Sequence, residues 1–266
     1  MLIRILILAC VSFRLHAQEF SPAPFLGMGK AALAQEGIFS LQDNPSGISN
    51  IQQANVASAY QQHFGSVGIA TQALYIALPL FNQTSLGATL VNYGIFEVTS
   101  LLRGGLSFVR GFGAHFSAAV TVNYHQYVVQ QYESDRRYSA DLGFQYAFSP
   151  ALTLGAFWRN IGQASFSTYI DQRIPTEAGL GLRTLLGKEV DIAADIWYES
   201  NGQITYKTGI AYHLHPRFVL RGGVSSDPVA FSCGFGIRME KWHMDMASSF
   251  HPVLGSSPQL SLSYAF

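Results

Sequence analysis

Histidine, aspartate and serine side chains at alternate positions raise the question of hydrolytic catalysis. His125, His243 and Asp245 each occupy the polar face of a segment in which apolar and polar residues alternate. A hydrolase of the α/β type carries its nucleophile in a Gly-x-Ser-x-Gly elbow, and this sequence has none. Nothing in the sequence places a serine beside the three residues. We therefore predict a protein without enzymatic activity, catalytic residues or cofactor.

Two other patterns could bind a metal ion or a dinucleotide. His213 and His215 share one face of a strand end, a spacing that can hold a metal. No carboxylate accompanies them and Pro216 marks a turn, so we predict no metal site. The run Gly27-Met28-Gly29-Lys30-Ala31-Ala32 matches a dinucleotide fingerprint, which needs a preceding strand. Ser21-Pro22-Ala23-Pro24 precedes it instead, so we reject nucleotide binding.

Charged side chains in the alternating segments suggest a ladder of opposite charges. A turn centred near Gly187 would bring Arg183 opposite Asp191, and a turn near Asn201 would bring Asp195 opposite Lys207. Two interpretations are open for these four residues. They neutralise one another and fix the strand register, or they form a polar wall along a permeation path.

The composition narrows the class of protein that must position these residues. Charged residues make up 12% of the 266 residues, the formal net charge is zero, and aromatics reach 13%. Between Asn44 and Phe96 there is no Asp, Glu, Lys or Arg. A disordered chain needs more charge and fewer aromatics, and a nucleic-acid-binding protein needs a basic surface. The composition therefore rules out a disordered chain and disfavours a nucleic-acid-binding protein.

Alternation with a period of two recurs along the chain and predicts β-strands. Phe116, Val120 and Val122 point to one side of such a segment, and Thr121 points to the other. No apolar run after the first residues is long enough for a membrane helix. We predict fourteen strands, near residues 54–62, 66–78, 83–93, 102–110, 114–129, 137–148, 151–160, 174–185, 189–199, 203–213, 217–225, 229–238, 241–250 and 258–266.

Two all-β architectures fit these strands, a soluble sandwich or barrel and a transmembrane antiparallel β-barrel. Many glycines and alanines stand on the small faces, and aromatic residues gather at the strand ends, as in the interfacial girdles of membrane barrels. These features favour the transmembrane barrel with its oily face toward lipid. The connections after even-numbered strands are tight, whereas those at 129–136, 161–173 and 251–257 are longer, which indicates an even strand count and both termini in the periplasm.

The two ends of the chain carry signals for export and assembly. Residues 1–17 have a positive Arg4, an apolar stretch and Leu15-His16-Ala17, and are typical of a secretory signal peptide cleaved near Ala17. We therefore expect the protein in the outer membrane of a Gram-negative cell, in contact with its lipids. The last strand alternates and ends on an aromatic residue, as in the signal that the barrel-assembly machinery recognises; this assignment rests on Leu260, Leu262, Tyr264 and Phe266.

The segment before the first strand does not alternate, and a barrel of fourteen strands has a lumen wide enough to need closing. The glycine- and alanine-rich run that contains Gly27 and Gly29, followed by Asp43-Asn44-Pro45-Ser46-Gly47, resembles the N-terminal hatch of the FadL-like outer-membrane barrels. Ser46 stands where that pattern has alanine, and Gln42-Asp43 stand where an aromatic residue often precedes the Asn. The resemblance implies a plug over residues 18–53 and a barrel over 54–266.

The resemblance implies two functions of different classes. The first is a channel for hydrophobic small molecules, with the segment around Asn44–Gly47 as a movable plug. The second is a partner-binding barrel of a type IX secretion complex, as in the PorV and PorQ proteins of the same superfamily. A third reading is a structural barrel with a filled lumen. The outer connections are short for a fatty acid transporter, which weakens the uptake interpretation.

Overall fold

The computed structural model describes residues 20–65, 68–95, 97–130, 133–167 and 173–266. The predicted signal peptide, residues 1–17, and its cleavage site lie outside these ranges. Within them, the helices are single turns and none could traverse a lipid bilayer. The short helices come first, as α1 (Ala23–Leu26), η1 (Ile38–Gln42) and η2 (Pro45–Ile48).

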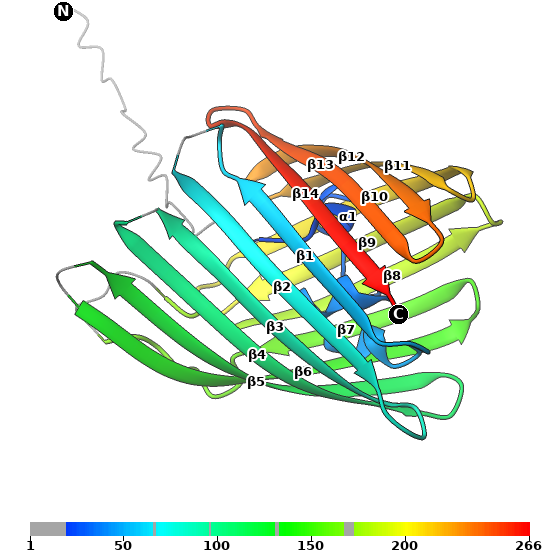
Figure 1. The fold of residues 1–266 in the computed structure, drawn as a ribbon, viewed down its shortest axis with the longest axis horizontal. Helices are drawn as coiled ribbons and strands as arrows, with labels where there is room; N and C mark the ends of the chain where they lie inside the picture. Colours follow the sequence, from blue (N-terminus) through cyan, green and yellow to red (C-terminus); the bar gives the residue numbers. More distant parts are fainter. Residues whose placement is uncertain (1–19, 66–67, 96, 131–132, 168–172) are drawn as a thin grey trace, which may run out of the picture.

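Fourteen strands follow and close into a barrel in which every strand pairs antiparallel with its sequence neighbours and β1 pairs with β14 (Figure 1). This confirms the fold class predicted from the alternation. The strands are β1 (Asn55–Gln62), β2 (Ile69–Pro79), β3 (Thr84–Ile95), β4 (Thr99–Phe112), β5 (Phe116–Val129), β6 (Glu133–Ser149), β7 (Leu152–Arg159), β8 (Glu177–Leu186), β9 (Val190–Glu199), β10 (Ile204–His215), β11 (Phe218–Ser226), β12 (Val229–Met239), β13 (Trp242–His251) and β14 (Gly255–Ala265).

Large apolar side chains face outward, and small and charged ones face the lumen. Phe144, Phe231 and Leu262 are 38%, 60% and 37% exposed, whereas Ala119 and Asp195 on inward positions are 2% and 5% exposed. A soluble barrel would show the reverse distribution. The outward direction of the oily face, predicted from the sequence, is therefore confirmed.

The sequence predicts long outer connections at residues 129–136 and 251–257, and for both the predicted length is wrong. Residues 129–136 and 251–257 belong largely to hairpins, because β5 extends to Val129, β6 begins at Glu133, β13 extends to His251 and β14 begins at Gly255. The ladder of backbone hydrogen bonds continues past the last apolar side chain, since it needs no particular side chain. Between β7 and β8, the residues that the structure describes, 160–167 and 173–176, do lie outside the strands.

A candidate site inside the barrel

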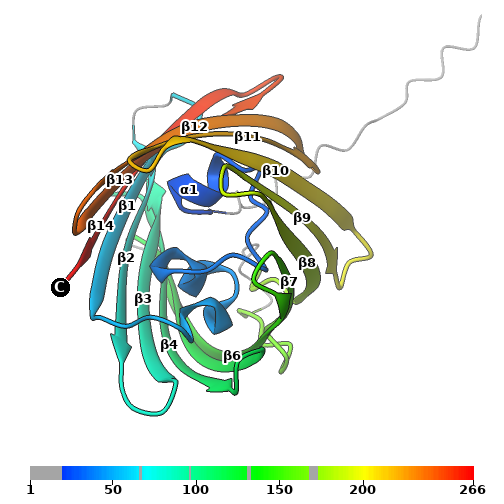
Figure 2. The ribbon, with the colours of Figure 1, turned by 90° about the vertical axis from the view of Figure 1, so that its right-hand side faces the viewer.

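Residues 20–53, called here the lumen segment, lie within the ring of strands (Figure 2). Helix α1 contacts β12, β13 and β14, and the two 3₁₀ turns contact β1 to β6. Apolar residues of the segment, Phe25, Phe39 and Leu41 among them, form the largest buried cluster together with small wall residues such as Ala57 and Ala73. The short helices thus contact two adjoining arcs of the inner wall, because β14 pairs with β1.

The turn Asn44-Pro45-Ser46-Gly47 is folded by its own side chains and tied to the wall. The Asn44 side-chain oxygen accepts hydrogen bonds from the Ser46 backbone N–H (3.4 Å) and the Ser46 hydroxyl (2.6 Å) and caps η2. Its amide nitrogen donates to the carbonyl oxygens of Leu33 (2.7 Å) and Phe144 (3.0 Å). Ser46, the departure from the family pattern, therefore adds a hydrogen bond that alanine would lack.

The glycines singled out in the segment allow close approach of backbones. Gly29 has φ +65°, and a Cβ there would lie 2.5 Å from the backbone oxygen of Thr208 in β10. A Cβ at Gly47 would lie 2.4 Å from the Gln35 carbonyl oxygen, and one at Gly27 would lie 3.1 Å from Arg221 Cβ. These residues serve packing against the wall and against the segment itself.

The wall is complementary in shape to the lumen segment, because several of its inward positions beside the segment are also glycines. A Cβ at Gly155 would lie 2.0 Å from the Leu33 carbonyl oxygen, and one at Gly209 would lie 2.2 Å from that of Met28. We call this set the glycine seat, and it comprises Gly87, Gly143, Gly155, Gly179, Gly181, Gly209 and Gly223. From the sequence, these glycines could be assigned to the small faces of the strands, but their contacts with the lumen segment were not predicted.

Asp195, one of the four residues of the predicted ladder, binds the segment. Its carboxylate accepts hydrogen bonds from the backbone N–H groups of Ala32 (2.7 Å) and Leu33 (3.0 Å). Lys207 lies opposite Asp195 in register, and its ammonium group stands 4.5 Å from the centre of the Trp197 ring. The Asp195 carboxylate thus connects the wall to the lumen segment, a contact beyond the predicted pairing with Lys207.

The other two ladder residues, Arg183 and Asp191, form the predicted ion pair, but the predicted register of their strands is wrong by one residue at the turn. Arg183 Nε donates to Asp191 Oδ2 at 2.9 Å, and Arg183 Nη1 lies 3.2 Å from a carboxylate oxygen of Glu36 in the segment. Asp191 lies directly opposite Leu185, whereas Arg183 lies opposite Ala193, because the turn is centred one residue later than expected. The pair forms diagonally, since residues two apart share a face.

Arg159 and Gln145 take part in the site although they are not among the four residues of the predicted ladder. Arg159 forms an ion pair with Glu177 at 2.7 Å and lies 3.8 Å from the carboxylate of Asp43 in the segment. The Gln145 amide donates to the carbonyl oxygens of Leu33 (3.0 Å) and Gln35 (2.9 Å). Their position beside glycines on an inward face is the signal that could have indicated them.

The histidines considered for catalysis or metal binding do not assemble into a centre. His125 in β5 interacts with Ser139 at 2.8 Å, and Asp245 in β13 pairs with Arg221 at 2.7 Å. Within the part of the chain that the structure describes, no three His, Cys, Asp or Glu side chains gather as metal ligands would.

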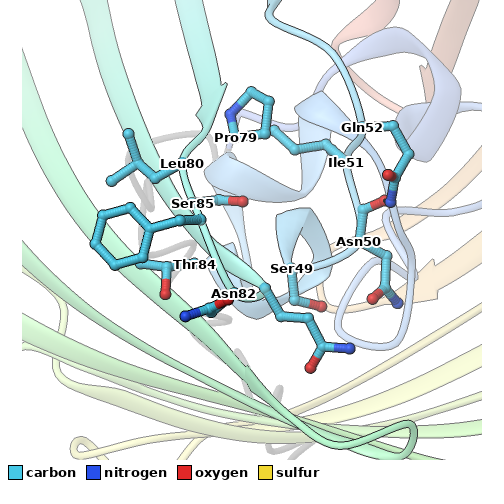
Figure 3. Close-up of a pocket in the computed structure, with 11 residues that line it drawn as sticks. Ser49, Asn50, Ile51, Gln52, Pro79, Leu80, Asn82, Thr84 and Ser85 are labelled. Atoms are coloured by element: carbon cyan, nitrogen blue, oxygen red, sulfur yellow. The ribbon is translucent and has the colours of Figure 1, made fainter.

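A cavity of about 320 Å³ lies where the lumen segment leaves the barrel to join β1 (Figure 3). Residues 49–52 of the segment line one side, and residues 79–85, which include the turn between β2 and β3, line the other. The lining contains amide, hydroxyl and apolar groups but no charged side chain. It is the same end of the barrel where the Phe266 N–H donates to the Ala54 carbonyl oxygen (3.0 Å).

The predicted assembly-signal residues lie on the outer face of β14 and at its end. Leu260, Leu262 and Phe266 are exposed, and the Tyr264 ring stands 4.7 Å from that of Trp242 on β13. Their recognition by an assembly machinery stays a prediction.

Fold and contacts together define a closed fourteen-stranded barrel with an internal N-terminal segment. Its structure is similar to that of the toluene transporter TodX of Pseudomonas putida, with a TM-score of 0.73 and 13% identity over 93% of this chain and 98% of that one. The monoaromatic hydrocarbon channel CymD is similar with a TM-score of 0.69 and 12% identity, over 92% of this chain and 97% of the other.

A FadL homologue of Pseudomonas aeruginosa gives a TM-score of 0.66 and 13% identity, over 92% of this chain and 98% of that one. At these identities the likeness concerns the fold. No family model matches the sequence, and no curated protein matches it significantly. None of these neighbours is a secretion accessory, so the type IX alternative gains no support.

Proposed function

We propose that this chain is an outer-membrane channel for small hydrophobic molecules, in which the lumen segment is the plug. The exposed apolar side chains of the strands suit the hydrocarbon region of a bilayer, where a charged residue would be costly. The neighbours in fold include a toluene transporter and a monoaromatic hydrocarbon channel, which supports a cargo of this class.

The observation that carries the proposal is the apolar seam between the plug and one side of the wall. Phe39, Leu41 and Ile48 of the plug face inward alanines and Val109 on β1 to β5. Such a seam would open a path if the plug moved toward the strands that carry the ion pairs Arg159–Glu177, Arg183–Asp191 and Arg221–Asp245. The alanine and valine lining suits a hydrophobic solute better than a sugar or an ion, although the Tyr75 hydroxyl also lies there and donates to Gln42 of the plug (3.2 Å).

The uncharged cavity of Figure 3 lies at the end of the seam, and its lining of amide, hydroxyl and apolar side chains suits an entrance that water fills. Ile51 belongs to the cavity lining and also packs against the apolar cluster. We propose that this cavity is the periplasmic mouth of the path, consistent with the expected periplasmic position of the short turns.

Expression in a Gram-negative host tests the function. We expect faster entry of 1-N-phenylnaphthylamine, a hydrophobic dye that fluoresces in phospholipid, in cells with the barrel than in cells without it. Leu41→Lys, which places a charge in the seam, should change the rate of dye entry, whereas Leu74→Ala on the outward face should not. Entry no faster than in empty cells, with the barrel folded in the outer membrane, would refute the proposal.

A further inference from the structure

One apolar side chain of the plug occupies a recess in the barrel wall. Leu33 is fully buried and packs against Phe157 and Trp197. The floor is backbone: a Cβ at Gly179 would lie 2.7 Å from Leu33 Cδ1, and one at Gly181 would lie 2.6 Å from Leu33 Cβ. We call the space bounded by these two glycines and two aromatic rings the Leu33 recess.

The walls of the recess are held by contacts that do not involve Leu33. The rings of Phe157 and Trp197 meet edge to face with centroids 6.1 Å apart. The Arg159 guanidinium lies 5.5 Å from the Phe157 ring and 5.4 Å from the Trp197 ring, and the Lys207 ammonium lies 4.5 Å from the Trp197 ring. The recess should therefore keep its shape when Leu33 leaves it.

The backbone of Leu33 links the recess to the position of the plug. Its N–H donates to Asp195 (3.0 Å), and its carbonyl oxygen accepts from Asn44 (2.7 Å) and Gln145 (3.0 Å). Withdrawal of the side chain would displace the backbone and strain these three hydrogen bonds, two of which join plug and wall. What fills the recess thus influences whether the plug stays in place.

We propose that the Leu33 recess is a binding subsite for a small apolar ring, and that a ring bound there displaces Leu33 and loosens the plug. The inference rests on the proposed function and names the class of cargo that would act on the plug. Two aromatic walls and a glycine floor suit a single aromatic ring, which can take edge-to-face contacts with both walls. Because Leu33 fills the recess in the closed state, such a ring binds only the open state and shifts the equilibrium toward it.

Quenching of Trp197 fluorescence by bromobenzene tests the subsite, because bromobenzene is a small apolar aromatic ring that carries a heavy-atom quencher. The chain has three tryptophans; Trp158 and Trp242 are half exposed on the outer face, and Trp158→Phe with Trp242→Phe leaves Trp197 as the reporter. We compare Leu33→Ala with Leu26→Ala. Both leucines are fully buried in the plug, but Leu26 packs against Ala23 and Ala247, away from Trp197.

We expect saturable quenching in the two-substitution background, saturation at a lower bromobenzene concentration with Leu33→Ala, and background behaviour with Leu26→Ala. Quenching that does not saturate and is equal in all three proteins would overturn the proposal, since it would report only bromobenzene dissolved in the detergent. Heat-modifiable migration on a gel checks that each barrel is folded. If Leu33→Ala does not fold, Leu33→Val carries the same comparison with a smaller effect.

Dye entry measured on the same variants separates this inference from the channel itself. Leu33-dependent quenching without any dye entry would refute the channel function and leave the subsite intact. Dye entry without Leu33-dependent quenching would refute the subsite and leave the channel function intact.

Discussion

At the scale of single residues, buried polar side chains of the wall act on the backbone of the plug. Asp195 accepts hydrogen bonds from two backbone N–H groups of the plug, and Gln145 donates to the Leu33 carbonyl oxygen. In the reverse direction, Asn44 of the plug donates to the Phe144 carbonyl oxygen of the wall. Hydrogen bonds to an ionised group contribute more than neutral ones. The carboxylate of Asp195 should therefore be the strongest single attachment of this part of the plug.

Asp195→Asn should loosen the plug around Ala32 and Leu33. The amide keeps one acceptor oxygen but loses the charge, at a cost of ~1.5–3 kcal/mol for the charged hydrogen bonds. Faster hydrogen exchange of the two backbone amides, together with faster dye entry, is the expected result. Asp191→Asn is the matched control, because Asp191 also faces the lumen but pairs with Arg183. Equal exchange in both variants would contradict the role given to Asp195.

A buried histidine in the connection between β1 and β2 makes stability depend on pH. Burial, with a smaller contribution from the positive charge of Lys30, lowers the pKa of His63 from 6.5 to about 4. Below pH 6.5 the unfolded chain binds a proton that the folded chain does not, so stability falls between pH 6.5 and about 4 and is constant above. The thermal unfolding midpoint of the wild type should therefore fall more steeply over this range than that of His63→Gln. Parallel curves would show that His63 does not contribute.

At the scale of elements, the strands meet the plug through positions that have no side chain. Gly209 and Gly223 on neighbouring strands both touch Met28, and Gly155 touches Leu33. The backbone of the plug therefore rests directly on that of the barrel. A single methyl group is enough to disturb such a contact, since packed interiors resist extra volume.

Gly223→Ala should push the plug away from β11. The new Cβ would lie 2.2 Å from the backbone nitrogen of Gly29, and overpacking of this kind costs ~1–3 kcal/mol. We expect faster dye entry and easier proteolysis near Met28. Gly222→Ala, one residue earlier, meets nothing within 4 Å and should behave as the wild type. The interpretation fails if the two variants are alike.

The strands could be predicted from the sequence, whereas most contacts of the site could not, because the strands follow a local pattern and the contacts join residues far apart in the chain. Alternation is a local property of a strand, so β5, near Phe116–Val129, could be predicted within two residues. The Asn44–Gly47 turn is also local. Its partner, the Phe144 carbonyl oxygen, is a backbone atom that leaves no trace in residue type. The same holds for the amides that bind Asp195, which is why the ladder seemed to involve wall residues only.

At the scale of the whole molecule, the belt of outward apolar side chains determines where the barrel can be stable. Leu180 is 63% exposed in the middle of β8, and Leu106 is 70% exposed on β4. In water such a surface would associate, whereas in a bilayer it contacts acyl chains. The connections between strands lie outside the hydrocarbon region and do not need apolar outward side chains.

Leu180→Arg should destabilise the barrel in lipid by ~2–4 kcal/mol, the cost of a cation near the bilayer midplane. Val253→Arg, at a residue that is 76% exposed in the connection between β13 and β14, should be tolerated. Equilibrium unfolding in guanidinium from lipid vesicles measures both. Equal stability of the two variants would mean that the face of β8 does not meet lipid.

The glycine seat also determines how this pore could be re-engineered. The wall is already reduced to backbone at Gly155, Gly179 and Gly181, so beside these positions more space is gained by shortening side chains of the plug. Adding carbon atoms at the seat's positions would displace the plug, because a Cβ at Gly155 or Gly209 would lie 2.0 Å or 2.2 Å from its backbone. If the barrel conducts as proposed, a design that admits bulkier solutes should therefore begin with side chains of residues 20–53 and leave the glycines of the strands unchanged.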